Sequence, residues 1–153
     1  MHATIEAERD IAAVVTELYT LISGPAGFAR DWKRQSELFL PGARMIRTSV
    51  DAEGRPQALA MTVEDYPDNF RQKIGDNAFY EAQTHCITEV FGNIAHAFSA
   101  YEAWADAERT RFIKRGINSI QLYNDGRSWK VVNMIWDDER PGLTMPAKYK
   151  GGC

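Results

Sequence analysis

The first part of the chain carries apolar residues in a helical pattern. Between residues 4 and 23 they recur every three or four positions, which is the spacing of one buried helix face. Gly24 and Pro25 follow and predict the end of this helix. Asp31 is a favourable N-cap residue and predicts the start of a second helix, which Pro41 ends.

A third helix is predicted after two short extended segments, residues 44–50 and 57–61. Thr62 and Asp65 have the spacing of a capping box, and aromatic and aliphatic residues follow at the i+4 spacing of a helix. Pro67 lacks the N–H that a helix interior needs, so this helix can start several residues later.

From residue 77 onward the pattern changes to long extended segments rich in β-branched and aromatic residues. Turn signals separate these segments at residues 92–93, 106–109 and 125–126. We therefore expect four long strands joined as an antiparallel meander. Helices followed by such a sheet are typical of the α+β class.

The last hairpin has a definite cross-strand register if residues 125–126 form a two-residue loop. Asn118 then lies opposite Asn133, and Lys114 lies opposite Asp137. The face that contains these asparagines is mostly apolar and is therefore predicted to face the core. It carries Gly116, Asn118, Ile120, Leu122, Trp129, Val131, Asn133 and Ile135.

The preceding hairpin, which turns at residues 92–93, has one face without charge. Cys86 lies opposite Ser99 on this face, and Thr84 lies opposite Tyr101. We expect this face to point inward, unless a β-bulge inverts part of it. The other face, which suits solvent or a polar subunit interface, carries Glu81, Gln83, His85, Ile87, Glu89, His96, Phe98, Glu102 and Trp104.

Length and charge narrow the class of protein. The chain of 153 residues suits a single domain, which we expect to span residues 1–140, with a loosely ordered tail at 141–153. A net charge of -3 gives no general attraction for nucleic acids or anionic lipids. No segment reaches the roughly 18 apolar residues of a membrane helix, and the N-terminus lacks a signal-peptide pattern. Cys86 and Cys153 are not expected to form a disulfide. These features predict a cytoplasmic protein without a nucleic-acid or membrane partner.

The order of elements and the last strands resemble the nuclear transport factor 2-like superfamily, and within it the SnoaL-like branch. The resemblance covers residues 11–138 and rests on GNIAHAFSAYE in one strand and RGINSIQLYNDGRSWKVVNMIW in the last two. It implies a cone-shaped α+β barrel, in which three N-terminal helices pack on a strongly curved, mostly antiparallel sheet. It also implies a ligand pocket between the helices and the concave sheet, and a homodimer formed through the sheet.

Members of this superfamily differ in function. They include isomerases, dehydratases, polyketide cyclases and epoxide hydrolases, and also proteins that only bind or assemble. The enzymes mostly need an Asp or His base inside the pocket. The two faces predicted to point inward contain neither residue type around their centres, which counts against catalysis in this chain. The fold alone does not decide between these functions.

Polar and aromatic residues of the predicted inner surface are the candidates for ligand binding. Asn118 and Asn133 can orient a carbonyl or hydroxyl group, or they can hydrogen-bond each other. The aromatic candidates can line the pocket or simply pack in the core. The six candidates are Tyr19, Trp32, Tyr101, Asn118, Trp129 and Asn133.

Asp137 is the candidate catalytic residue, because it lies at the rim of the predicted inner face and can act as a general base. Its alternative role is a cross-strand ion pair with Lys114. His85 and His96 share the predicted outer face without being cross-strand neighbours, and no third ligand has metal-site spacing. We therefore predict no metal and no cofactor.

The sequence leaves three functional hypotheses open. The first is a dimeric small-molecule-binding protein with a largely apolar pocket. The second is a cofactor-independent isomerase, dehydratase or cyclase that uses acid–base chemistry on a carbonyl compound, with Asp137 as its base. The third is a non-catalytic dimerisation module. The homodimer is expected to form through the outer sheet face, which carries His85, Glu89, His96 and Phe98.

Overall fold

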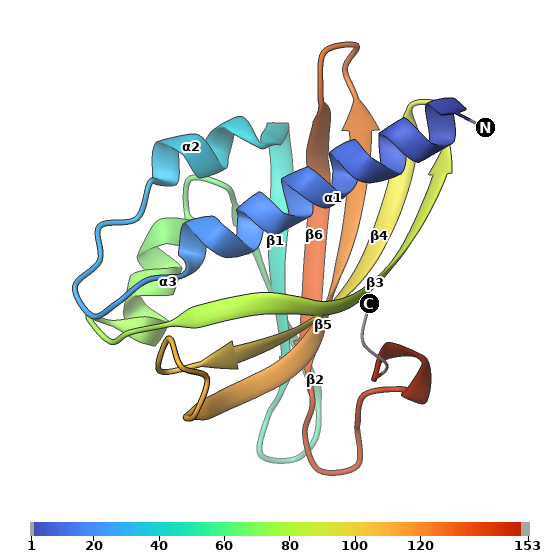
Figure 1. Ribbon diagram of the computed structural model, residues 1–153. Helices are drawn as coiled ribbons and strands as arrows, with labels where there is room; N and C mark the ends of the chain where they lie inside the picture. Colours follow the sequence, from blue (N-terminus) through green and yellow to red (C-terminus); the bar gives the residue numbers. More distant parts are fainter. Residues whose placement is uncertain (1, 151–153) are drawn as a thin grey trace.

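Three α-helices lie against a curved six-stranded sheet in the computed structural model, which describes residues 2–150 (Figure 1). The helices are α1 (His2–Ile22), α2 (Trp32–Glu37) and α3 (Tyr66–Ile74), with a short 3₁₀-helix η1 (Ala147–Tyr149) near the C-terminus. The strands are β1 (Phe39–Val50), β2 (Pro56–Thr62), β3 (Tyr80–Phe91), β4 (Ile94–Trp104), β5 (Phe112–Asn124) and β6 (Trp129–Asp138).

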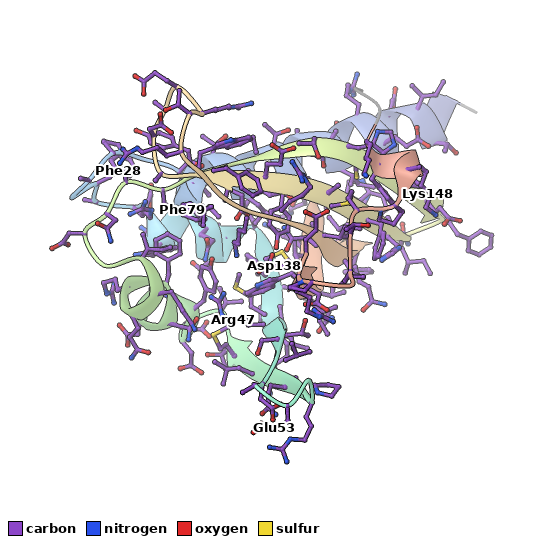
Figure 2. All side chains as sticks on the ribbon, turned by 90° about the horizontal axis from the view of Figure 1, so that it is seen from below. Phe28, Arg47, Glu53, Phe79, Asp138 and Lys148 are labelled. Atoms are coloured by element: carbon purple, nitrogen blue, oxygen red, sulfur yellow. The ribbon has the colours of Figure 1, made fainter. Side chains whose placement is uncertain are left out.

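The strands follow the order β2-β1-β6-β5-β4-β3 across the sheet. Strands β1 and β6 are parallel, and every other neighbouring pair is antiparallel. Helix α1 crosses the concave face, and the β1–β2 hairpin projects from the sheet with Glu53 at its tip (Figures 1 and 2). The predicted α+β architecture is therefore confirmed, with a sheet that is open at its edge strands β2 and β3.

Helix α1 buries the apolar stripe that its sequence predicts. Ile11 and Val15 are almost completely buried, and Tyr19 lies one turn further along the same face. These residues belong to one hydrophobic core with Ile120 and Leu122 of β5. Since each such buried aliphatic side chain contributes about 1.5–3 kcal/mol, this stripe holds α1 on the inner face of the sheet.

Helix α2 begins where the sequence predicts but ends earlier. The Asp31 carboxylate caps it by accepting a hydrogen bond from the Arg34 N–H at 2.9 Å. The helix ends at Glu37, because the chain enters the sheet at Phe39. The prediction of helix up to Pro41 is therefore wrong, since this proline lies in β1, at an irregularity in the pairing with β6.

The predicted capping pair is present before α3. The Asp65 N–H donates to Thr62 Oγ1 at 3.0 Å, and the Thr62 N–H donates to the Asp65 carboxylate at 3.3 Å. The helix itself begins at Tyr66, so Pro67 lies in its first turn, where no N–H is required. The predicted third helix and its late start are both confirmed.

A bulge in β3 inverts the first half of this strand. Near the hairpin turn the pairing is as predicted, with Cys86 opposite Ser99. The register then shifts between Gln83 and His85, so Gln83 lies opposite Tyr101. The predicted pairing of Tyr101 is therefore wrong, and the side chains of β3 before the bulge have the opposite orientation to the one predicted.

The β5–β6 hairpin has a longer loop than predicted and also contains a bulge. Its loop spans residues 125–128, because Asn124 lies opposite Trp129. A bulge in β6 then shifts the pairing by one more residue. Asn118 therefore lies opposite Trp136, and the predicted pairing of two asparagines inside the sheet is wrong.

The segment after β6 packs on the outer face of the sheet as far as Lys150. Met145 and Tyr149 are buried there against Ala100 of β4. The backbone N–H of Met145 donates to the Glu139 carboxylate at 2.6 Å. The tail predicted to be loosely ordered thus has packing contacts of its own in this range, and residues 151–153 lie outside the described part of the chain.

Candidate functional site

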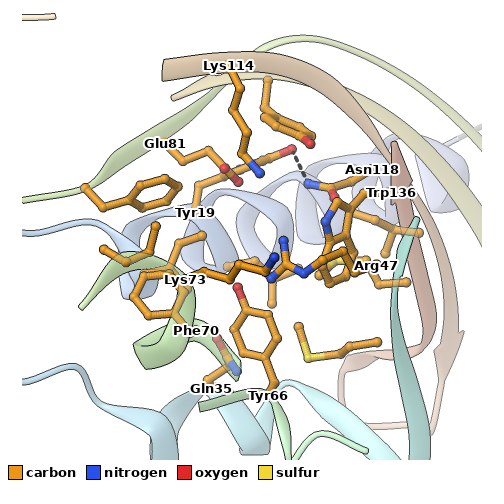
Figure 3. A pocket seen from close by; sticks show the side chains of 18 of the residues that line it. Tyr19, Gln35, Arg47, Tyr66, Phe70, Lys73, Glu81, Lys114, Asn118 and Trp136 are labelled. Atoms are coloured by element: carbon orange, nitrogen blue, oxygen red, sulfur yellow. Dashed lines mark hydrogen bonds between the residues drawn. The ribbon is translucent and has the colours of Figure 1, made fainter. Parts of the chain in front are cut away.

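A cavity of about 220 Å³ lies between the helices and the concave face of the sheet (Figure 3). An apolar cavity of about 150 Å³ is large enough for benzene, so this one suits a substituted ring or a small bicyclic molecule. Its apolar wall includes Leu18, Ile22, Met45, Phe70, Phe79, Ile113, Ile120, Met134 and Trp136.

Three of the six predicted ligand-binding residues, Tyr19, Tyr101 and Asn118, lie in the cavity wall. Asn118 Nδ2 donates to the Tyr19 hydroxyl at 3.0 Å (Figure 3). That hydroxyl lies 2.6 Å from Ser99 Oγ, which in turn donates to Gln83 Oε1 at 2.7 Å. Tyr19 therefore donates to Ser99, and the chain of hydrogen bonds satisfies these buried polar groups and holds α1 against β4 and β5.

The other three predicted residues lie elsewhere. Trp32 packs behind the cavity wall, with its ring 5.4 Å from that of Phe70. Trp129 is buried in the core, at the loop end of β6. Asn133 lies opposite Gln121, on the outer face of the sheet, because of the bulge in β6. None of these three side chains lines the cavity.

Asp137, the predicted catalytic residue, also lies outside the cavity. The bulge in β6 turns this side chain to the outer face, where it accepts a hydrogen bond from Arg140 Nη1 at 2.8 Å. Its neighbour Asp138 takes the inward position, and Lys114 Nζ lies 3.4 Å from Asp138 Oδ2. The predicted ion pair of Lys114 with Asp137 is therefore wrong by one residue.

Glu81 provides the carboxyl group of the cavity, although the sequence pattern places it on the outer face. The bulge in β3 turns it inward. Its backbone is fixed to the end of α1, because the Glu81 N–H donates to Ser23 Oγ at 2.9 Å, and that hydroxyl donates to the Tyr19 carbonyl at 2.8 Å. Among residues 2–150 its carboxyl group has no hydrogen bond or ion pair.

The surroundings of Glu81 change its acidity. Burial raises the pKa of its carboxyl to about 7, the positive charges of Lys114 and Arg47 oppose this rise, and the negative charge of Asp138 adds to it. Near neutral pH this carboxyl therefore exists in both protonation states. A group with such a pKa can take up a proton and release it again during one reaction.

Tyr101 and Lys114 of the cavity wall both bind Asp138, which lies outside the lining. The Tyr101 hydroxyl donates to Asp138 Oδ1 by reaching across Gly116, which lies between them in the sheet. Burial, and next the charge of Asp138, raise the pKa of Tyr101 well above its usual value. Tyr101 thus stays protonated, and its hydroxyl is committed to Asp138.

Two neutral hydrogen-bond donors in the wall have no hydrogen bond among the described residues. Gln35 is only 2% exposed, and its Nε2 makes no hydrogen bond. The Tyr66 hydroxyl points into the cavity (Figure 3), and burial, followed by the charge of Glu81, raises its pKa. Because Tyr66 remains neutral, it can donate to an oxygen atom of a bound molecule.

Sequence reasoning did not identify Gln35, Tyr66, Arg47 or Glu81 as site residues. For Glu81 a signal existed: Phe79 is buried, and residues two apart on a strand share a face. Counting forward from Phe79 places Glu81 inward, whereas counting back from the turn places it outward. The conflict between the two counts is itself the signature of a bulge.

Across residues 2–150, no three His, Cys, Asp or Glu side chains come together in a way that could hold a metal ion. No helix in this range is long and apolar enough to cross a membrane.

Comparison with known proteins identifies the fold. No family model matches the chain, and no curated protein matches its sequence. An NTF2-like protein with a cystatin-like fold from Novosphingobium aromaticivorans is 13% identical, with a TM-score of 0.68 over 88% of this chain and 82% of that one. A protein of unknown function with a cystatin-like fold from Nostoc punctiforme is 11% identical, with a TM-score of 0.67 over 89% and 95%.

A further match is a protein assigned as the beta subunit of an aromatic-ring-hydroxylating dioxygenase from Novosphingobium aromaticivorans. It is 11% identical, with a TM-score of 0.67 over 100% of both chains. At such identities the matches establish the fold alone: this chain has the nuclear transport factor 2-like, or cystatin-like, fold. The resemblance predicted from the sequence is confirmed at that level, and the SnoaL-like branch stays a prediction.

Proposed function

We propose that this protein is an acid–base enzyme for a small carbonyl compound, with the Glu81 carboxyl as its proton-transfer group. The observation that carries the proposal is a carboxyl group in a largely apolar cavity that makes no hydrogen bond or ion pair within the described residues. Its pKa of about 7 suits proton transfer at neutral pH. Glu81 takes the role that was predicted for Asp137, because Asp137 lies on the outer face.

The proposed reaction needs one base and one donor. The Glu81 carboxylate removes a proton from the carbon next to the carbonyl group, while the Tyr66 hydroxyl donates a hydrogen bond to the carbonyl oxygen, where negative charge develops. In a β,γ-unsaturated carbonyl compound this gives a dienolate, and Glu81 then returns the proton to the γ carbon, so the double bond moves to the α,β position and the isomerisation is complete. The apolar wall strengthens both interactions, because it excludes water from the reacting atoms.

A test of this role uses 5-nitrobenzisoxazole, a small, flat and neutral compound. A base removes its one carbon-bound ring proton next to nitrogen, the N–O bond breaks, and a coloured nitrophenolate forms without a co-reactant. We expect the wild-type protein to produce it at least about tenfold faster than the Glu81→Gln variant, because a positioned base typically contributes about 10²–10⁴-fold. The rate, followed by absorbance, should rise with pH to a plateau with an apparent pKa of about 7.

The control for this experiment is Glu108→Gln, which removes an exposed carboxylate from the loop between β4 and β5, away from the cavity. Its rate should equal that of the wild type. Equal rates for wild type and Glu81→Gln, with the compound shown to bind, would sink the enzymatic proposal and leave the small-molecule-binding hypothesis in its place.

We also propose that the protein forms a homodimer through the part of the outer sheet face that its own tail leaves uncovered. Tyr149 stacks on two residues of the predicted interface, with its ring 5.6 Å from that of His85 and 5.9 Å from that of Phe98. The uncovered part carries the cross-strand pair Phe91 and Ile94, which are 84% and 61% exposed. Large exposed apolar side chains of this kind mark interaction surfaces.

The dimer predicts a specific effect of Ile94→Asp. Placing a carboxylate in the centre of this patch is expected to weaken the dimer by about 2 kcal/mol, or roughly thirtyfold. Light scattering across a dilution series measures the change. Leu59→Asp, on the exposed edge strand β2, is the matched control and should not alter the mass. A wild-type protein that is monomeric throughout the series would contradict this proposal.

A further inference from the structure

The lining of the cavity carries an excess of positive charge that the proposed proton transfer does not use. Arg47 of β1, Lys73 of α3 and Lys114 of β5 line the cavity, and Glu81 is the one carboxylate among its lining residues in the described chain. The whole chain has a net charge of -3, so this excess is local. A cavity that is apolar and cationic suits an apolar molecule with a negative group.

Arg47 is held ready for such a group. Its Nε and Nη2 donate to Asn69 Oδ1 at 3.3 and 2.8 Å, and its guanidinium group lies 5.2 Å from the centre of the Trp136 ring. These contacts fix the orientation of the guanidinium group and leave Nη1 without a hydrogen bond among residues 2–150. A guanidinium group fixed in this way binds a carboxylate with little loss of freedom.

Within residues 2–150, Lys114 forms an ion pair, whereas Lys73 does not. Lys114 lies 3.4 Å from the Asp138 carboxylate, whereas neither Lys73 nor Arg47 forms an ion pair within the described residues. The side chains of Lys73 and Arg47 both point into the cavity from opposite walls, α3 and β1 (Figure 3). Two cations that face one cavity repel each other, and a bound anion removes that repulsion.

The neutral groups of the wall point to the same kind of ligand. Gln35 Nε2 is buried without a hydrogen bond, and the Tyr66 hydroxyl also lacks a partner in the described chain. Both are donors. With Arg47 and Lys73 they give the cavity several unused donors against one unused carboxyl, Glu81, so a ligand rich in acceptor oxygens satisfies most of this capacity.

We propose that the substrate of this site is a small cyclic keto acid, whose carboxylate is bound by Arg47 and Lys73. This proposal rests on the acid–base function above and adds the substrate class to it. The ring occupies the apolar part of the cavity, and the keto group faces Tyr66 and Glu81. The carboxylate thus fixes which carbon atom lies nearest to the Glu81 carboxyl.

Binding of 2-naphthoate and 2-naphthamide tests this proposal, because the two compounds share one ring system and differ in charge. Titration calorimetry should give a wild-type affinity for the acid at least about tenfold higher than for the amide, as expected for a charge-assisted pair. In the Arg47→Gln/Lys73→Gln variant this ratio should fall to within about twofold of one. The ratio is informative even if the variant is less stable, because both affinities come from the same protein.

The matched control is Lys33→Gln/Arg127→Gln, which removes two exposed cations away from the cavity and changes the net charge equally. It should keep the wild-type ratio. The single variant Arg47→Lys, which keeps the charge, should retain a clear preference for the acid. An acid-to-amide ratio near one in the wild type, or a ratio unchanged by the double substitution in the cavity, overturns the proposal.

The two proposals fail independently. The substrate 5-nitrobenzisoxazole is neutral, so its Glu81-dependent conversion does not require Arg47 or Lys73. Conversion without a preference for 2-naphthoate rejects the keto acid and keeps the acid–base function. Selective binding of 2-naphthoate without Glu81-dependent conversion rejects the acid–base function.

Discussion

Replacing Gly116 with alanine is expected to destabilise the protein by roughly 3 kcal/mol and to lower its melting temperature by roughly 6–12 °C. Gly116 lies in β5 between Tyr101 of β4 and Asp138 of β6. A methyl group at this position would overlap the Asp137 carbonyl and would lie 2.5 Å from Asp138 Oδ1 and 2.6 Å from the Tyr101 hydroxyl. It therefore crowds the backbone and breaks the bond between Tyr101 and Asp138. Thermal unfolding monitored by circular dichroism measures the loss.

The matched control is Gly54→Ala in the β1–β2 turn. Gly54 has a φ of 79°, and an added methyl group there meets nothing within 4 Å. Gly54→Ala is therefore expected to lower the free energy of unfolding only through conformational strain, by about 1–2 kcal/mol. Since Gly116 has an ordinary strand conformation, alanine without a clash would stabilise the strand. A Gly116→Ala variant as stable as the wild type would thus show that its neighbours can move apart.

The sequence predicted the helices and strands well, because local chemistry determines them. The apolar stripe of α1 has helical spacing only, and Gly24 and Pro25 mark where the helix ends. Asp31 caps α2 as expected. The two-residue turn at residues 92–93 gives the correct pairing for the adjacent half of the β3–β4 hairpin. Each of these features depends on residues that are close together in the chain.

The candidate site was predicted poorly, because two bulges reverse the side chains that matter. One bulge turns Glu81 into the cavity, and the other exchanges Asp137 for Asp138. A bulge adds one residue to one strand, and every residue beyond it then faces the other side. Tyr101 and Asn118 were placed correctly because no bulge in their own strands lies between them and the turns from which they were counted.

The remaining site residues come from elements that gave no functional pattern. Gln35 lies on a helix of only 6 residues, and Arg47 looks like any charged residue of a partly exposed strand. They meet only because α2 and α3 close over the concave sheet that contains β1, which is a consequence of tertiary packing. The cavity between helices and sheet was expected from the resemblance, but its chemistry depends on these distant residues.

Replacing Glu81 with glutamine is expected to stabilise the protein by about 3 kcal/mol above pH 7, although the same change removes the proposed catalytic group. The pKa of Glu81 is raised from 4.5 to about 7 by folding. Between these two values the folded state binds more protons than the unfolded state, so the wild-type stability falls as pH rises. Each pH unit in this window lowers the free energy of unfolding of the wild type by about 1.36 kcal/mol, and the full decrease is present above pH 7.

Glutamine has the shape of the protonated carboxyl and does not ionise, so the variant lacks this loss. Chemical denaturation should therefore give similar stabilities near pH 4.5 and a variant that is more stable at about pH 8, with a melting temperature roughly 6–12 °C higher. Glu108→Gln, at an exposed position away from the cavity, should show no such pH-dependent gain. A Glu81→Gln variant that is less stable than the wild type at pH 8 contradicts the assignment. A residue that weakens the fold at neutral pH is expected where its charge serves a reaction.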